Sequence, residues 1–338
     1  MKRAGGWLLG VLVVVAMAAG GWFALRRTLF AETVTVVLMR TGNSDPTMKA
    51  LSRGAAAALA ERSGRAGRFR VRLHEADPDT DLPEKTVIWI GTSEGMNLKN
   101  DFHATLKVAA FDVDPWRNLG ATSLSVTLPQ LGDLAAGWAK KSNAARVLLI
   151  RDKESTHSMF IADRFIKEAR RLGLTLVADR SAAEPDLTEQ ILSARPDLVF
   201  FSGEKAPYGT AKKIFGPLRE KGFAGPLVMA EADPEVSYLA TRPDLVEGCY
   251  LITPFAPAPP DVAARMQTTQ GPHVTAGYFA MKAVLDILDQ ADSSDEVELR
   301  RAATRVPNLA RPCAVYVARS NLFRFVEELK WEPLPVSD

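Results

Sequence analysis

Four short apolar runs indicate the fold class: ARVLLIRD (145–152), LTLVADR (174–180), PDLVFFSG (196–203) and GPLVMAEAD (225–233). Amphipathic segments that end near Gly173, Ala194 and Gly222 separate them. Short Val, Leu, Ile and Phe runs that alternate with amphipathic helices are typical of a parallel sheet covered on both faces. Ligands of such sheets bind at the carboxyl ends of the strands. The sequence therefore directs the search for a site to Asp152, 202–205 and 231–233.

Length and composition describe an ordinary globular protein of more than one domain. The chain has 338 residues, of which 47% are hydrophobic and 24% charged, and this length exceeds one ordinary core. The net charge is +2, and without the four basic residues that flank the first apolar run the remainder is slightly acidic. No basic field therefore points to nucleic acid. Cys249 and Cys313 are too few for a disulfide scaffold, and both a single bridge and two buried thiols remain open.

The N-terminal segment, 1–30, contains a predicted membrane span or signal. Trp7 to Leu25 is uncharged and long enough to cross a bilayer as a helix. Lys2 and Arg3 favour a cytoplasmic N-terminus. A cleaved secretory signal is the alternative. In both cases we expect the globular part outside the cytoplasm, either anchored to the cell membrane or soluble in the periplasm.

The rest of the chain predicts alternating strands and helices. A turn-rich segment, EADPDTDLPEK (75–85), separates two of the strands and is too short for a full crossover helix. We expect strands at 34–39, 69–74, 86–90, 106–113, 123–129, within 248–255 and at 314–320, and helices at 48–62, 131–143, 274–291 and 296–305, with a short tail at the end.

Five stretches, taken in order, resemble the type I periplasmic solute-binding proteins, of which the leucine/isoleucine/valine-binding protein is the best known. They are VTVVLMRTG (34–42), LSRGAAAALAE (51–61), SLSVTLPQLGDLAAGWAKK (123–141), ARVLLIRD with ADRFIKEARRLGLTLV (145–177), and LVEGCYLITPF (245–255). Each fragment is a weak match by itself. The ordered set covers roughly Val34 to Ala318.

The resemblance implies an α/β fold with two doubly wound parallel-sheet lobes, joined by three crossings and closing on a ligand by a hinge motion. Lobe 1 would comprise 31–127 plus 254–312, and lobe 2 would comprise 128–253 plus 313–338. The implied crossings lie near 125–129, 253–255 and 313–317. Such proteins bind a small solute, commonly an amino acid, for an ABC importer, and some act as sensors. No enzymatic activity and no cofactor are implied.

Several positions depart from the pattern of that family. EADPDTDLPEK replaces a much longer segment of lobe 1, and Thr156 and His157 align with a usual tyrosine–glycine pair. Asp112 and Asp114 stand where small residues usually accept a carboxylate. Unpaired carboxylates there would repel the carboxylate of an amino acid. Our hypothesis is that the ligand is cationic, or absent, and is not a typical branched-chain amino acid.

Eight residues are candidate ligand contacts: Thr41, Asn43, Ser44, Ser93, Asp112, Glu204, Glu231 and Asp233. Each also has an ordinary structural reading. Thr41, Asn43 and Ser44 are common turn and N-cap residues, and Ser93 would serve equally as a helix cap. Glu231 and Asp233 follow the fourth strand, where the resemblance places a carboxylate that binds an ammonium group.

Catalysis and metal binding are weaker interpretations. GTSEG (91–95) matches the G-x-S-x-G nucleophile elbow, with Ser93 as the nucleophile. Too few strands precede it for a hydrolase sheet, and His273 is the single histidine that stands well downstream in an Asp-then-His order. The four histidines lack the spacing of metal ligands.

Two functional classes remain open. The first is a membrane-tethered or periplasmic binding protein that passes an amino-acid-like or cationic solute to an ABC permease. The second is a module with an altered or absent ligand that acts as a sensor or partner protein at the membrane surface.

Overall fold

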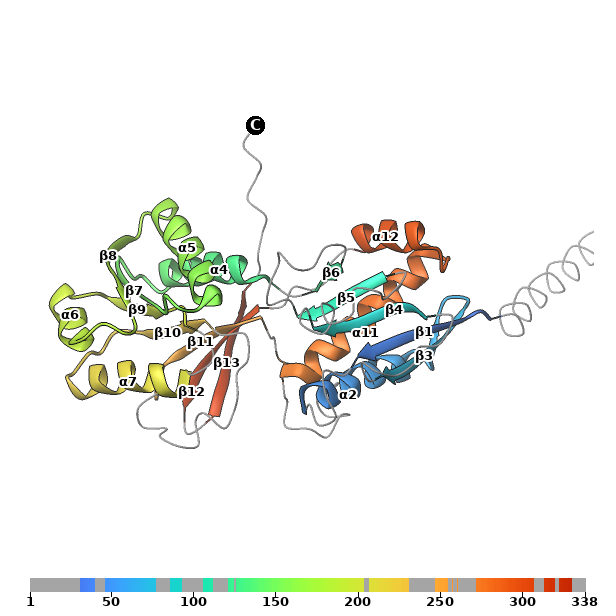
Figure 1. The fold of residues 1–338 in the computed structure, drawn as a ribbon, viewed down its shortest axis with the longest axis horizontal. Coiled ribbons are helices and arrows are strands. Elements are labelled where there is room, and N and C mark those ends of the chain that lie inside the picture. The colour runs from blue at the N-terminus through green and yellow to red at the C-terminus, as the bar shows by residue number, and fades with distance from the viewer. Residues whose placement is uncertain are drawn as a thin grey trace, which may run out of the picture.

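The computed structural model describes residues 31–39, 46–76, 86–92, 106–111, 121–124, 126–203, 207–230, 247–254, 257, 260, 272–306, 313–319 and 322–329. Their strands form two sheets, each with its own helices, and Figure 1 shows them as two lobes side by side. We call the sheets A and B, in lobes 1 and 2.

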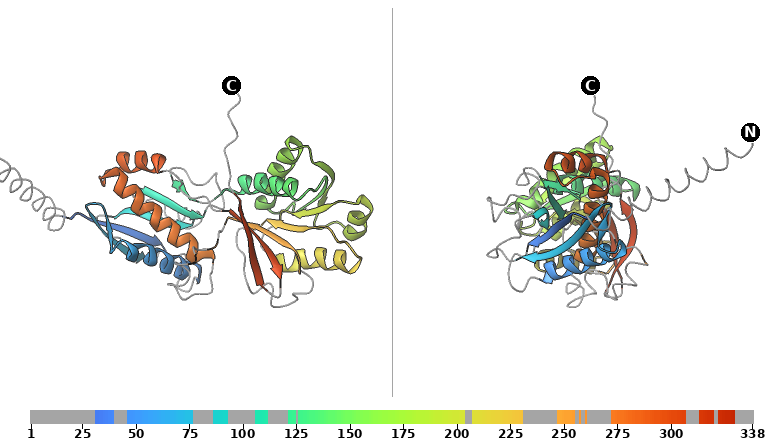
Figure 2. Two further views of the ribbon diagram at one scale, coloured as in Figure 1. Left: turned by 180° about the vertical axis from the view of Figure 1, so that it is seen from behind. Right: turned by 90° about the vertical axis from the view of Figure 1, so that its right-hand side faces the viewer.

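Sheet A has the order β2-β3-β1-β4-β5-β6. Its strands are β1 (Thr33–Met39), β2 (Arg65–Ala66), β3 (Phe69–Ala76), β4 (Thr86–Thr92), β5 (Leu106–Phe111) and β6 (Ala121–Ser123). All neighbours are parallel except β2 and β3, which form an antiparallel hairpin. The described helices of this lobe are α2 (Pro46–Glu61), α11 (Pro272–Ala291) and α12 (Glu296–Arg305). They pack on one face of the sheet. In the left view of Figure 2, which is seen from behind, the sheet lies behind α11.

Sheet B has the order β13-β12-β11-β10-β9-β7-β8. Its strands are β7 (Arg146–Arg151), β8 (Thr175–Ser181), β9 (Leu198–Phe201), β10 (Leu227–Ala230), β11 (Tyr250–Thr253), β12 (Cys313–Arg319) and β13 (Leu322–Leu329). The strands from β7 to β11 are parallel, whereas β12 and β13 are antiparallel additions. The described helices of this lobe are α4 (Leu128–Lys141), α5 (Thr156–Arg171), α6 (Leu187–Ala194) and α7 (Pro207–Glu220).

The apolar runs of sheet B are continuous because both faces of the sheet are covered. Val147 and Leu149 of β7 pack in a cluster with α4 and α5. Leu148 and Ile150, which alternate with them, pack in a second cluster with α6 and α7. Side chains on a strand point alternately to opposite faces, so a strand buried on both sides has no polar positions. The predicted two-lobed α/β architecture is confirmed, although both sheets are mixed rather than purely parallel.

The segment 123–129 (SLSVTLP) was expected to be a strand, and that prediction is wrong. The strand β6 covers Ala121–Ser123, and the chain then enters α4 at Leu128. Thr127 is the N-cap: its hydroxyl accepts from the N–H of Gln130, and the Gln130 side chain accepts from the N–H of Thr127. This reciprocal capping box begins a helix where the alternation of apolar residues indicated a strand.

The end of the chain also differs from the prediction. Cys313–Val317, which we expected at the third crossing, lies within β12 of sheet B. The chain therefore passes between the lobes before Cys313, after α12 ends at Arg305. The expected short tail contains β13, whose Phe325 is 47% exposed. An edge strand is less buried than a central one, so it lacks a strong apolar pattern.

Two glycines bring α2 and α11 into unusually close contact. A Cβ atom on Gly54 would lie 1.8 Å from the carbonyl oxygen of Val274, and one on Gly277 would lie 2.0 Å from that of Leu51. No side chain fits at such distances. The first helix of lobe 1 and a helix more than 200 residues later are thus in backbone contact.

The two cysteines are free and buried on opposite faces of sheet B. Cys249 belongs to the cluster with α6 and α7, and Cys313 to the cluster with α4 and α5. The sheet separates them, so of the two alternatives the structure has two buried thiols. Burial raises the pKa of the Cys249 thiol to about 12, and it also raises the pKa of Cys313.

Among the described residues, no helix combines the length and apolar character that crossing a membrane requires. The predicted span at 7–25 lies outside these residues.

Candidate functional site

The candidate site is defined by the ends of parallel strands in both sheets. In sheet B the chain leaves β7 for α5 on one face, and it leaves the neighbouring β9 for α7 on the other face. This reversal is a topological switch point, where ligands bind in open α/β sheets. In sheet A, β1 and β4 are neighbours in the same way, because the chain moves outward to β3 after β1 and returns to β4.

These edges face one another across the two lobes. The first crossing leaves the carboxyl end of β6 and enters α4 at Leu128. The return crossing leaves the carboxyl end of β11 after Thr253. Figure 1 shows the ends of β1 and β5 turned towards lobe 2. Both switch points therefore lie on the sides of the sheets that the crossings connect.

All eight predicted contacts, Thr41, Asn43, Ser44, Ser93, Asp112, Glu204, Glu231 and Asp233, lie outside the described residues. The strands that lead to them are described. Thr41, Asn43 and Ser44 follow β1, Ser93 follows β4, and Asp112 follows β5. Glu204 follows β9, and Glu231 and Asp233 follow β10.

The strand ends from which these candidate residues follow lie next to one another in each sheet. Leu38 of β1 pairs with Ile90 of β4, and Thr92 of β4 pairs with Phe111 of β5. In the other lobe, Met229 of β10 pairs with Phe201 of β9. Each group of candidates thus leaves its sheet from adjacent strand ends. Their roles as ligand contacts stay predictions.

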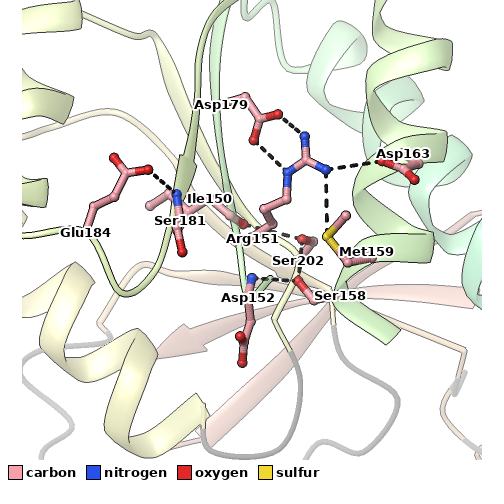
Figure 3. Close-up of polar contacts among 10 residues, drawn as sticks. All are labelled: Ile150, Arg151, Asp152, Ser158, Met159, Asp163, Asp179, Ser181, Glu184 and Ser202. Atoms are coloured by element: carbon pink, nitrogen blue, oxygen red, sulfur yellow. Dashed lines mark hydrogen bonds and ion pairs between the residues drawn. The ribbon is translucent and has the colours of Figure 1, made fainter. Parts of the chain in front are cut away.

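A buried serine pair organises the switch point of sheet B (Figure 3). The Oγ atoms of Ser158 and Ser202 lie 2.9 Å apart, and both residues are completely buried. The Ser158 Oγ also accepts from the N–H of Asp152 at 2.9 Å. The Ser202 hydroxyl donates to the carbonyl of Ile150 at 3.4 Å, so the hydroxyl of Ser158 donates to Ser202. These groups are satisfied within the protein and hold the start of α5 against β7 and β9.

Asp152, which the sequence singled out, lies on the half-buried rim of this network. Its Oδ1 accepts from the N–H of Glu154 at 3.0 Å, as in an Asx turn. Ser155 then caps α5, with its hydroxyl accepting from the N–H of Ser158 at 3.2 Å. Thr156 and His157, which align with a tyrosine–glycine pair in the resemblance, form the first turn of this capped helix.

Arg151 turns away from the strand ends and forms ion pairs within lobe 2. Its Nε donates to Asp179 at 2.8 Å, a second nitrogen also pairs with Asp179, and Nη1 lies 3.2 Å from Asp163 (Figure 3). The guanidinium is thus neutralised by α5 and β8, so the described rim offers no free cation from Arg151.

Thr253 is a residue that the sequence analysis did not single out as a contact. It is the last residue of β11, is completely buried, and its Oγ1 has no hydrogen-bond partner among the described residues. Buried hydroxyls are usually paired. An unpaired one at a strand end beside the return crossing is a candidate ligand group. Sequence analysis could not identify Thr253 as a contact, because threonine is a common residue in strands.

Within the described ranges, no group of His, Cys, Asp and Glu side chains is arranged to hold a metal ion. His74 lies on β3 and His157 and His273 lie in the first turns of α5 and α11. Ser93, the candidate nucleophile, follows β4 but lies outside the described residues.

Comparison with known proteins adds evidence at the level of structure. No family model matches the chain, and no curated protein matches its sequence. Among solved structures, a putative branched-chain amino acid ABC transporter protein from Rhodospirillum rubrum has a TM-score of 0.71 at 16% identity, with 88% of this chain and 100% of that chain covered. The leucine-binding protein LivK of Thermotoga maritima has a TM-score of 0.65 at 17% identity, covering 88% and 99%. A Rhodopseudomonas palustris solute-binding protein in complex with benzoate has a TM-score of 0.58 at 13% identity, covering 88% and 96%.

The chain has the type I periplasmic binding protein fold. The neighbours named above are binding or transport proteins, and none is described as an enzyme. Because the identities lie below 20%, the likeness establishes the fold and leaves the ligand to be argued from this chain's own residues.

Proposed function

We propose that this protein is a solute-binding protein of an ABC importer, anchored in the membrane by its N-terminal segment or released into the periplasm. It would capture a small molecule between the two lobes without chemical change. The observation that carries the proposal is the pair of switch points at facing edges of sheets A and B. Proteins of this fold close on a ligand by a hinge.

The ligand class follows from the residues at the strand ends. The chain continues from β5 into Asp112 and Asp114, and from β9 and β10 into Glu204, Glu231 and Asp233. If closure of the lobes buries these carboxylates, their desolvation costs much free energy unless a cation lies beside them. We therefore propose an amino-acid-like or wholly cationic solute, such as a polyamine, rather than a branched-chain amino acid.

A thermal-shift screen of the full chain against amino acids, polyamines, amides and short-chain acids tests this proposal. A ligand at one hundred times its dissociation constant adds about 2.7 kcal/mol to the stability of the folded state. Replacing Asp112 and Glu231 by Asn and Gln should abolish a shift caused by a cation. Micromolar binding of leucine, isoleucine or valine would refute the proposed ligand class.

One observation favours the second functional class, a sensor or partner module. Only nine residues, 77–85, join β3 to β4, which lie on either side of β1. The chain thus lacks room for a crossover helix there, where the resemblance to solute-binding proteins implies a much longer segment. No stabilisation by any compound in the screen would favour this alternative, and adjacent genes for a permease and an ATPase would favour the first.

A further inference from the structure

Three arginines gather on one face of the hairpin at the edge of lobe 1. Arg65 of β2 lies directly opposite Arg70 of β3, and Arg72 follows two residues later on the same face. Arg70 and Arg72 are exposed and Arg65 is half-buried. None of the three forms an ion pair or side-chain hydrogen bond with the residues that the structure describes. Like charges placed opposite each other on paired strands are destabilising, so this arrangement calls for an anionic partner.

The nearby acidic residues lie on the other side of the sheet. Phe69 and Val71 alternate with the arginines and are buried against α2 and α11, so the arginines face away from those helices. The carboxylates of Asp286, Asp289 and Asp292 belong to the helical side, where they pair with Arg62 and Arg68. The charges of this edge are therefore separated, with the unpaired positive ones on the side without a described helix.

The position of the hairpin relative to the predicted membrane span gives the arginines a partner. Arg70 pairs in register with Thr33, the first residue of β1. Thr33 is the eighth residue after Leu25, the end of the predicted span, and eight residues reach at most about 28 Å when fully extended. A bilayer surface at that distance lies within reach of the hairpin. The hairpin is at the opposite end of the molecule from α6 (Figure 1).

We propose that Arg65, Arg70 and Arg72 form a docking surface for anionic lipid headgroups, which holds lobe 1 against the membrane while lobe 2 extends away from it. The proposal rests on the predicted N-terminal anchor. A basic residue close to an anionic membrane increases binding about fivefold, so three residues change the ratio of docked to undocked molecules roughly 100-fold. The interaction weakens with salt because a Debye length is only about 8 Å at physiological ionic strength.

Energy transfer between a labelled protein and labelled lipids tests the proposal. The native thiols are buried, so a fluorescent donor can be placed selectively on Ser63→Cys, an exposed position in the turn before β2. The full chain is reconstituted into vesicles of phosphatidylcholine, or of phosphatidylcholine with phosphatidylglycerol, that carry an acceptor on a headgroup. Ser193→Cys, exposed on α6 in lobe 2, is the control position for the donor.

The expected result is stronger transfer from position 63 in phosphatidylglycerol vesicles, lost in Arg65→Gln/Arg70→Gln/Arg72→Gln and at high salt. The matched triple Arg170→Gln/Arg319→Gln/Arg324→Gln removes the same charge from exposed sites in lobe 2 and should keep the effect. Equal transfer in both lipids, or equal losses in both triples, would overturn the docking surface. Release of the full chain from vesicles by alkaline carbonate would instead overturn the anchor and this proposal with it, without affecting the proposal of solute binding.

Discussion

At the scale of single residues, the hydroxyl groups of Ser158 and Ser202 link three pieces of chain at the switch point of sheet B. They join the end of β7, the end of β9 and the first turn of α5. Removing one hydroxyl leaves buried polar groups without partners. The cost of an unpaired buried group is about 1–3 kcal/mol.

We expect Ser158→Ala and Ser202→Ala each to lower the free energy of unfolding by about 1–3 kcal/mol. The double variant should lose less than the sum, because both changes remove the same hydrogen bond, with a coupling of about 0.5–3 kcal/mol. Urea unfolding of the four proteins measures this cycle. Ser193→Ala, on the exposed surface of α6, is the control and should change stability by less than about 0.5 kcal/mol. Additive losses would show that the two serines act independently.

The buried thiols predict both reactivity and a pH dependence of stability. Neither Cys249 nor Cys313 should react with a thiol reagent in the native protein, and both should react after denaturation. In the unfolded chain a thiol has a pKa of about 8.5, whereas burial raises the pKa of Cys249 to about 12. The thiols therefore stay protonated to a higher pH in the native state than in the unfolded chain. Stability falls as the pH rises above the pKa of the unfolded thiols.

Each thiol should lower the stability by on the order of 1 kcal/mol between about pH 7.5 and about pH 9.5. Urea unfolding at these two pH values measures the loss, and Cys249→Ala/Cys313→Ala should lose less stability over the same interval than the wild-type protein. An identical pH dependence in the two proteins would contradict burial of the thiols.

At the scale of elements, α4 contains two glycines in opposite environments. A Cβ atom on Gly132 would lie 2.3 Å from the carbonyl oxygen of Ile161 in α5, whereas one on Gly137 would meet nothing within 4 Å. Gly132 therefore permits the close approach of the two helices, and Gly137 only adds flexibility to the unfolded chain.

We expect Gly132→Ala to destabilise the protein by about 1–3 kcal/mol, because α5 must move to accommodate the methyl group. Gly137→Ala should stabilise it by about 0.4–1 kcal/mol, since alanine favours the helix and no contact opposes it. Thermal unfolding of both variants gives the comparison within one helix. Equal effects of the two substitutions would mean that α4 and α5 do not meet at Gly132.

The accuracy of sequence-based prediction varied with the environment of each element. Strands β7 to β10 could be predicted because burial on both faces makes them uninterrupted apolar runs. The start of α4 was missed because the capping pair of Thr127 and Gln130 lies inside an alternating pattern. The edge strand β13 was missed because it is partly exposed. The strand ends that bear the site were predictable from topology, but the Ser158–Ser202 network and the unpaired Thr253 depend on contacts that arise only in the folded lobe.

At the scale of the whole molecule, the chain passes between the lobes after β6, after β11 and after α12. In the proposed solute-binding function, hinge closure on a ligand would draw the two sheets together and make the protein more compact. The second functional class predicts no such change.

We expect a ligand found in the screen to reduce the radius of gyration measured by small-angle X-ray scattering. Ligand binding without compaction would contradict a hinged clamp.

Thr253→Val removes the unpaired hydroxyl at the return crossing while keeping the shape of the side chain. It should weaken ligand binding and leave the free energy of unfolding nearly unchanged, because the hydroxyl has no described partner to lose. A large loss of stability would assign Thr253 to the core instead.

The backbone contact between α2 and α11 has a consequence for biosynthesis. Lobe 1 begins the globular chain, yet its core contains Tyr278, Val284 and Leu299. Residues 126–253, by contrast, supply sheet B with every strand except β12 and β13 in one continuous stretch. Domains generally fold as their residues emerge during synthesis. In this protein the strands β1 to β6 must wait, without α11, until most of lobe 2 has been made, so the half that is synthesised first completes its core only near the end of translation.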